Sequence, residues 1–256
     1  MSVAGLSTRP LPTRRDEAWR YADMDAVARL GADALDQWQT IDVPAGESIS
    51  RCLVVGSDAP EMHRTRVTLG DGARAAFFVT NCGDDYTRVE IEVRLGRGAH
   101  FEFGGVTIGG AGVTREFVTQ VIHAEPDATS NQTVRAVHWG NGTGNFLGEI
   151  KVARHAQKTD AAQDFKALLL EAGASANAVP QLEIFADDVK CAHGATVGEL
   201  DEAARYYMMA RGLDPATAQR LLVQAFLGDA FVAMVDDAER ETLLTAALGV
   251  LEGAQL

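Results

Sequence analysis

Short runs in which polar and apolar residues alternate dominate the middle of the chain. The alternation is clearest at 88–95 (RVEIEVRL), where every second residue is apolar. Period two is typical of strands with one buried face, and the Gly, Asn and Asp residues between the runs are typical of turns. We therefore predict strands at 51–55, 75–79, 88–95, 117–122, 133–137, 146–152, 165–170 and 182–185.

The connections between these runs restrict the architecture. No segment with helical periodicity interrupts them between about 49 and 197, which argues against a βαβ layout. Small-residue corners recur at Ala99, Ala128, Ala156 and Ala174, with spacings of 29, 28 and 18 residues. The pattern favours an all-β sandwich or a β-helix of stacked coils. A hexapeptide-repeat acyltransferase is excluded, because aliphatic–Gly pairs do not recur every six residues.

Helices are expected before the strands. Thr13 is a potential N-cap, and Asp16 follows in what would be the first turn, which predicts a helix from about Arg14 into the thirties. Its apolar positions form only a partly regular stripe, which we expect to pack on the strand region or on a partner.

After Gly198 the apolar residues recur with the spacing of α-helices. Gly212 is placed to end a first helix, Asp214-Pro215 to begin a second, and Asp236 to cap a third. Apolar faces at 221–226 and 243–251 are suited either to dock a partner protein or to cap an open end of the sheet. The chain thus divides into an N-terminal helical segment (1–40), a β core (41–198) and a C-terminal helical subdomain (199–256).

The composition narrows the possible partners. The 256 residues are 46% hydrophobic, with 23 basic and 36 acidic residues that give a formal charge of −13. Nucleic acids and anionic membranes need clustered Lys and Arg, so neither is expected as the main partner. No apolar run approaches the roughly 18 residues of a membrane span.

The three cysteines indicate a reducing compartment. Cys52, Cys82 and Cys191 are odd in number and widely scattered, unlike the even framework of a secreted disulfide scaffold. Residues 1–10 lack the charged start and apolar core of a secretory signal. A soluble, cytoplasmic protein is the expectation.

Cys191 and His193 are the candidate metal ligands. They lie two residues apart in a run that reads as a strand, so both side chains are expected on one face. Thiolate and imidazole suit zinc and iron, yet two ligands do not close a tetrahedral site. The residues alone leave open a buried structural cysteine beside a hydrogen-bonded histidine.

Other catalytic patterns are missing from the sequence. No phosphate-binding loop G-x-x-x-x-G-K-[ST] and no G-x-S-x-G nucleophile elbow occurs. The remaining histidines are spread singly, and we expect each to be an ordinary strand or loop residue: His63, His100, His123, His138 and His155. ATP hydrolysis and serine-hydrolase chemistry by this chain alone are therefore not expected.

Several ordered motifs together resemble the SufD family of the SUF iron–sulfur cluster assembly machinery. They are RRDEAWRY at 14–21, QDFKALLL at 163–170, PQLEI at 180–184, DDVKCAHGATVG at 187–198 and RYYMMARGL at 205–213. The fourth motif favours SufD over its paralogue SufB, which usually has Glu where Gly194 stands here.

This resemblance implies a mainly β fold: a right-handed parallel β-helix with a short N-terminal helical segment and a C-terminal helical subdomain. It implies a non-enzymatic scaffold that pairs with SufB through the β-helix and binds the SufC ATPase through the C-terminal helices. The family's functional histidine maps onto His193, with Cys191 beside it. No cofactor would be bound permanently, and a transient iron–sulfur cluster would form at the interface with SufB. Many relatives carry a larger N-terminal helical region.

Two other functions remain open. A self-associating β-helical structural or adaptor protein would use Cys191 and His193 only for packing. A metal-dependent enzyme would use His193 but lacks further ligands at readable spacing. The isolated chain is also expected to be capable of forming a homodimer through the surface that would otherwise meet SufB.

Overall fold

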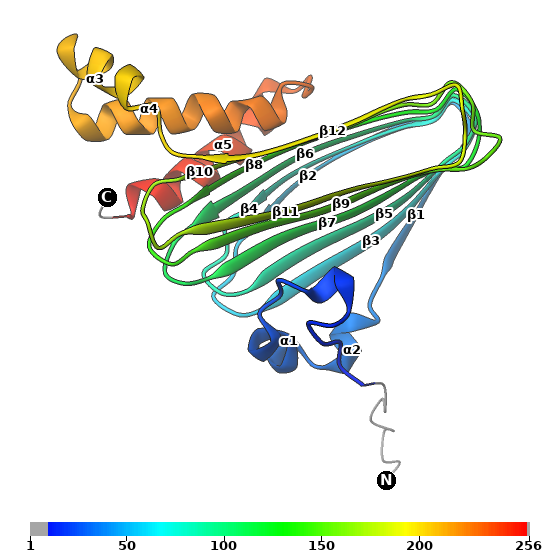
Figure 1. Ribbon diagram of the computed structural model, residues 1–256, viewed down its shortest axis with the longest axis horizontal. Coiled ribbons are helices and arrows are strands. Elements are labelled where there is room, and N and C mark those ends of the chain that lie inside the picture. Colours follow the sequence, from blue (N-terminus) through cyan, green and yellow to red (C-terminus); the bar gives the residue numbers. More distant parts are fainter. Residues whose placement is uncertain (1–9, 255–256) are drawn as a thin grey trace.

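Two parallel six-stranded sheets form the body of the protein (Figure 1). A computed structural model describes residues 10–254. Sheet A contains β1 (Gln39–Val43), β3 (Glu61–Leu69), β5 (Thr87–Leu95), β7 (Thr114–His123), β9 (Thr143–Val152) and β11 (Ser175–Ile184). Sheet B contains β2 (Ser48–Val55), β4 (Arg74–Asn81), β6 (His100–Gly109), β8 (Thr129–His138), β10 (Asp160–Leu169) and β12 (Lys190–Gly198).

Consecutive strands alternate between the sheets, so each pair of strands makes one coil of a β-helix. In sheet B, position 74 aligns with 100, and then with 129, 160 and 190, so one coil takes 26 to 31 residues. All strand pairs are parallel, and each strand pairs with the strand two places along the chain. The predicted parallel β-helix is confirmed, and the sandwich alternative is not the fold.

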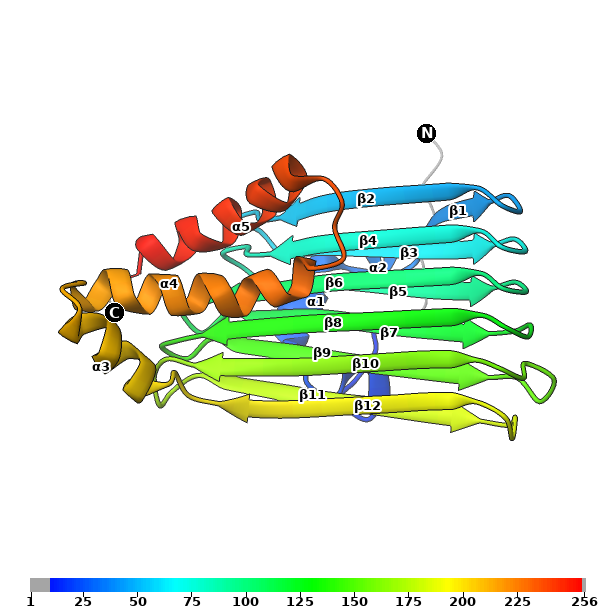
Figure 2. The same ribbon diagram turned by 90° about the horizontal axis from the view of Figure 1, so that it is seen from above.

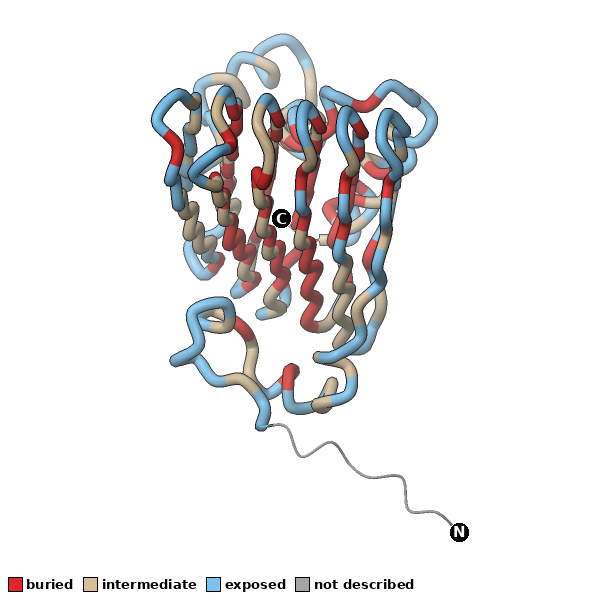
Figure 3. The backbone as a smooth tube through the Cα atoms, turned by 90° about the vertical axis from the view of Figure 1, so that its right-hand side faces the viewer, coloured by how far each residue is buried: buried red, intermediate tan, exposed pale blue. Residues whose placement is uncertain are grey.

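Apolar side chains fill the space between the sheets. Phenylalanine rings from both sheets contact one another there in pairs, with centroids 5.3 to 6.0 Å apart: Phe77–Phe101, Phe103–Phe117 and the stacked Phe146–Phe165. Burial is most complete in the central coils, whereas the strands at both ends, β2 and β12, are mostly exposed (Figure 3). The interior is therefore open at each end of the stack.

The C-terminal helices cover the outer face of sheet B. They are α3 (Glu202–Ala210), α4 (Pro215–Gly228) and α5 (Asp237–Glu252), with a short 3-10 helix η2 (Asp229–Phe231) between the last two. Asp201, Asp214 and Asp236 cap their first turns, and Gly212 ends α3 at φ 98°, so the predicted caps at Asp214 and Asp236 are confirmed. Figure 2 shows α4 and α5 lying across β2 to β8 and leaving β12 uncovered.

The buried positions of α4 and α5 pack against the outer face of sheet B. Val223, Leu227, Leu243 and Leu248 are buried against a cluster on that face that includes Phe78. Arg135 of β8 joins the two layers through ion pairs with Asp164 (2.6 Å) and Asp229 (2.9 Å). The helices therefore do not cap the open end of the β-helix, and the predicted face at 243–251 is largely used by the fold, whereas Leu221 of the face at 221–226 stays exposed.

The N-terminal segment is broken rather than one continuous helix. It contains a short 3-10 helix η1 (Glu17–Trp19), α1 (Met24–Leu30) and α2 (Ala32–Leu35). Thr13 does not cap a helix; its backbone N–H donates to Asp16 instead, and Asp23 caps α1. Gly31, at φ 79°, ends α1. A stronger cap downstream and a left-handed glycine thus override the predicted continuous helix.

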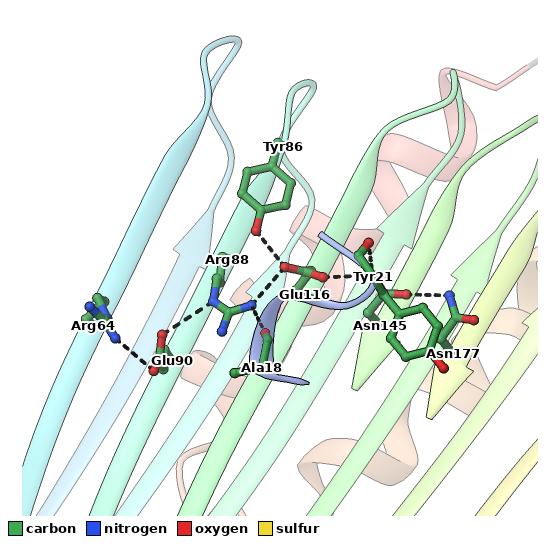
Figure 4. A network of polar contacts seen from close by, with 9 residues as sticks. All are labelled: Ala18, Tyr21, Arg64, Tyr86, Arg88, Glu90, Glu116, Asn145 and Asn177. Carbon is green, nitrogen blue, oxygen red and sulfur yellow. Dashed lines mark hydrogen bonds and ion pairs between the residues drawn. The ribbon is translucent and has the colours of Figure 1, made fainter. Parts of the chain in front are cut away.

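A buried polar network holds this segment against the outer face of sheet A (Figure 4). The carboxylate of Glu116 accepts hydrogen bonds from Tyr86 (2.6 Å), Arg88 (3.1 Å) and Asn145 (2.8 Å). Arg88 also donates to the carbonyl of Ala18 at 2.9 Å, and its guanidinium stacks on Trp19 at 4.0 Å. Arg88 and Glu116 are buried, so the pair is screened little by water.

Neutralising Glu116 should destabilise the fold strongly. Glu116→Gln removes one of the two carboxylates that pair with the buried Arg88 guanidinium and leaves only Glu90. The expected loss in the free energy of unfolding is about 3 kcal/mol. Glu92→Gln is the matched control, because Glu92 pairs with Arg66 at the surface and should cost at most about 1 kcal/mol. Urea unfolding measures both. Equal losses would show that the buried network does not hold the N-terminal segment.

Candidate functional site

Cys191 and His193 lie on β12, the edge strand of sheet B. Cys191 aligns with Ala161 and His193 with Gln163, and both partners on β10 are buried between the sheets. The strand and the shared face predicted for the two donors are confirmed. Both side chains belong to the inward face of the last coil, at the open end of the β-helix.

The two donors differ in exposure. Cys191 is half-buried and packs against the apolar group of Ile150, Val152 and Ala161. His193 is exposed, and among residues 10–254 no hydrogen-bond partner holds its ring. At the open end of the β-helix, the Cys191 thiol is therefore partly covered by apolar side chains, whereas the His193 imidazole is exposed to a molecule that approaches from outside.

Gln163 lies directly beneath His193 in the ladder. Its side chain is buried, and its Nε2 donates to the carbonyl of Gln181 on β11 at 3.3 Å. The carboxamide therefore links the two sheets immediately below the candidate site. Gln163 belongs to the QDFKALLL motif. Its position next to His193 could not be predicted, because the register between coils is a property of the fold.

The electrostatics keep Cys191 protonated in the isolated chain. Burial raises the pKa of its thiol, and the nearby Asp160 carboxylate raises it further. Because the thiolate is the nucleophile and the metal ligand, this cysteine is not activated by its surroundings. A cation that binds there has to displace the proton.

This chain supplies an incomplete ligand set. Within the described residues, no group of three or more His, Cys, Asp or Glu side chains is placed to hold a metal ion. A thiol and an imidazole on one face suit iron or zinc, but a stable site needs about four ligands. The remaining ligands would have to come from a second molecule that covers the open end.

The other histidines are not part of this site. His123 and His138 are buried, and burial lowers their pKa values to about 4 and about 3, so both are neutral at physiological pH. His63 and His100 lie on β3 and β6, and His155 lies in the turn before β10. Their predicted places in strands and loops are confirmed.

The helical surface offers a second exposed feature. On α3, the side chains of Tyr206 and Tyr207 are 74% and 60% exposed, and Met209 is 38% exposed. Arg211 stacks on Tyr207 with its guanidinium 5.0 Å from the ring centroid. No residue of α3 is buried, so this helix presents exposed aromatic surface. No helix within residues 10–254 is long and apolar enough to cross a bilayer.

Comparison with known proteins places the β-helix in a family. The model of the SufBD core domain of the SUF system for FeS cluster assembly matches residues 45–226. The chain is 36% identical over 126 residues to iron-sulfur cluster assembly protein SufD of Escherichia coli, covering 49% of this chain and 30% of that protein.

Other relatives extend the similarity along the chain. Protein ABCI7, chloroplastic, of Arabidopsis thaliana is 40% identical over 114 residues, which cover 44% of this chain and 24% of the relative. A SufBD family protein of Mycobacterium tuberculosis is 29% identical over 241 residues, which cover 89% of this chain and 56% of the relative. The chain thus spans about half or less of the length of these relatives.

The raised thiol pKa values predict slow alkylation of the isolated protein. At pH 7, iodoacetamide should label Cys191 more slowly than a free cysteine, because each unit of pKa removes about tenfold of the thiolate. Cys52 should be slowest, since burial and its hydrogen bond to Glu239 raise its pKa to about 12. Asp160→Asn should speed labelling of Cys191 and leave Cys52 unchanged. Mass spectrometry of each site gives the rates, and a Cys191 as reactive as free cysteine would contradict this account.

Proposed function

The chain belongs to the SufBD family of the SUF iron–sulfur cluster assembly system, and from this premise we propose that it is the SufD-type scaffold subunit. It pairs with a SufB paralogue through the open end of the β-helix and binds the SufC ATPase. A nascent iron–sulfur cluster is its transient cargo. The scaffold itself is non-enzymatic and works in the cytoplasm.

One observation carries this proposal: the exposed edge strand is also the strand with the donor pair. Sheet edges expose unpaired backbone N–H and C=O groups, and soluble proteins normally cover them. Within the described residues, β12 has β10 on one side and no strand on the other. A strand from SufB that continues the ladder would satisfy this edge and bring its own side chains over His193.

The donor set suits a shared site. His193 can contribute a ring nitrogen without first losing a hydrogen bond, because no described residue holds its ring. Cys191 loses its proton only when a metal replaces it, so the cluster would form when iron and the partner are both present. A half-site of this kind favours transient cargo over a permanent cofactor.

The exposed face of α3 is the proposed docking surface for SufC. Its tyrosines and Met209 are types enriched in protein interfaces, and the face lies in the RYYMMARGL motif. The buried apolar positions of α4 and α5, such as Val223 and Leu243, are unsuitable because they support the fold. Since this sequence has no phosphate-binding loop, ATP hydrolysis would belong to the partner.

His193→Ala should abolish most cluster formation without preventing assembly. Removing a ligand should lower the yield of cluster by at least about tenfold, since even indirect partners of metal ligands contribute that much. The measurement is anaerobic reconstitution of the complex co-purified with SufB and SufC, followed by iron and sulfide analysis. Thr196→Ala, on the opposite face of β12, is the matched control and should retain the yield.

Two results would separate the alternatives. An unchanged cluster yield in the His193→Ala complex would refute the role of this residue. A wild-type complex that assembles but never holds iron would instead favour the adaptor function, in which Cys191 and His193 only pack.

Tyr206→Glu should weaken SufC binding by a large factor. Loss of a central aromatic contact in an interface commonly costs about 2 kcal/mol or more, which is roughly 30-fold in Kd. Because Tyr206 is exposed, the thermal unfolding midpoint should be unchanged. Val235→Glu is the control, since Val235 is 99% exposed but lies before α5, away from α3. Calorimetric titration measures Kd, and equal affinity for both variants would remove α3 from the interface.

A further inference from the structure

Buried polar side chains interrupt the apolar interior of the β-helix, and one group of them gathers at one corner. Where the strands of sheet B turn toward sheet A, five polar side chains face inward from successive strands, and all are buried. They are Asn81, Thr87, Thr107, Arg115 and His138. They lie at the corner opposite Cys191 and His193 along the strands, so they form a separate polar compartment.

The neutral members of this compartment mostly satisfy one another. The hydroxyl of Thr87 donates to Asn81, and the ring nitrogens of His138 pair with the Gly109 carbonyl at 2.9 Å and with Thr107 at 3.1 Å. What remains without a partner is Nδ2 of Asn81 together with Nε and Nη1 of Arg115. All three are donors, so the compartment has an excess of N–H groups and no matching acceptor.

Arg115 also carries an uncompensated charge. It is 2% exposed, and its only hydrogen bond runs from Nη2 to the backbone carbonyl of Gly83. Among residues 10–254, no carboxylate lies within ion-pair distance of it, whereas the buried Arg88 and Arg135 each have two. Burying a cation without an anion is strongly unfavourable.

Asp84, which lines the same cavity, interacts with the Arg115 charge but forms no ion pair with it within residues 10–254, and the nearer titratable groups do not neutralise it. Burial lowers the pKa of Arg115 to about 10, which still leaves the guanidinium protonated at neutral pH. His138 is uncharged there, since burial and the Arg115 charge lower its pKa to about 3. The Cys82 thiol is also protonated, because burial raises its pKa despite the guanidinium.

A cavity leads to the guanidinium from outside. It has a volume of about 540 Å³ and lies between the corner turns and the C-terminal half of α5. Arg115 and Trp139 line it on the β-helix side, and Gly249, Val250 and Gly253 on the helix side. Gly109 is required here, because a Cβ at that position, where φ is 148°, would collide with the guanidinium.

We propose that the Arg115 guanidinium, which lines this cavity, binds a small, singly charged inorganic anion of halide size that enters through it. Such an ion accepts hydrogen bonds from the guanidinium and needs no acceptor in return. A multiply charged oxyanion fits less well, because the Asp84 carboxylate and the negative end of the α5 dipole share the same cavity. The inference is independent of the scaffold function, since the compartment lies away from the candidate cluster site.

Bromide is the probe, because it can be located in a crystal. Crystals of the full chain soaked in sodium bromide should show an anomalous peak within hydrogen-bond distance of the Arg115 guanidinium. In solution, bromide at about fivefold over its Kd should raise the thermal unfolding midpoint by about 2–4 °C relative to gluconate at equal ionic strength.

The variants make the test specific. Arg115→Met should lose the bromide-dependent shift, whereas Arg135→Met should keep it, because Arg135 has its own carboxylates. If Arg115→Met fails to fold, the anomalous map of the wild type decides the matter alone. Bromide peaks confined to the protein surface, or equal midpoints of the wild type in both salts, would overturn the proposal.

Discussion

The hydrogen-bond ladder between parallel coils is the constraint from which the other features follow. Every backbone N–H and C=O of an inner strand points to a neighbouring coil, so the stack is saturated everywhere except at its two ends. The last strand carries this unsatisfied edge together with Cys191 and His193. The parallel ladder therefore both stabilises the inner coils and leaves unpaired backbone groups on β12. A second chain that pairs with β12 would complete the ladder and the ligand set together.

The lateral faces of the β-helix are covered by the chain's own ends. The N-terminal segment is held on sheet A by the buried Arg88–Glu116 pair, and α4 and α5 are held on sheet B by apolar packing and Arg135. Within residues 10–254, this coverage leaves the coil ends and α3 exposed. A scaffold that must meet two different proteins benefits from having its two contacts on separate elements.

The fold was predictable to the extent that burial follows simple periods. Strands with apolar alternation, such as 88–95, and capped helices, such as the one beginning at Pro215, are present as expected. β3 was missed because polar residues such as His63 and Thr65 occupy inward positions in its first half, and β6 because Gly104 and Gly105 interrupt it. The carbonyl of Ala230 approaches Gly104 so closely that no side chain fits, which is a tertiary cause.

The unequal spacing of the small-residue corners also has a cause that local sequence pattern does not reveal. Ala99 and Ala128 follow the left-handed corner residues Gly98 and Asp127 of stacked coils, but Ala174 lies in the opposite corner, which explains its shorter spacing. Local pattern placed Cys191 and His193 on one face correctly. It could not reveal that Gln163 lies beneath His193 or that Arg115 lacks an anion, because both depend on coils about 30 residues apart.

Hydrogen–deuterium exchange of the backbone amides at 190–198 tests the central claim most directly. If the open edge is completed by SufB, amides of β12 that point away from β10 exchange quickly in the isolated chain at low concentration and slow by orders of magnitude in the complex. The inner strands, such as β8, should be equally protected in both samples. Unchanged exchange along β12 in a complex that contains SufB would contradict the claim that a second chain finishes this site.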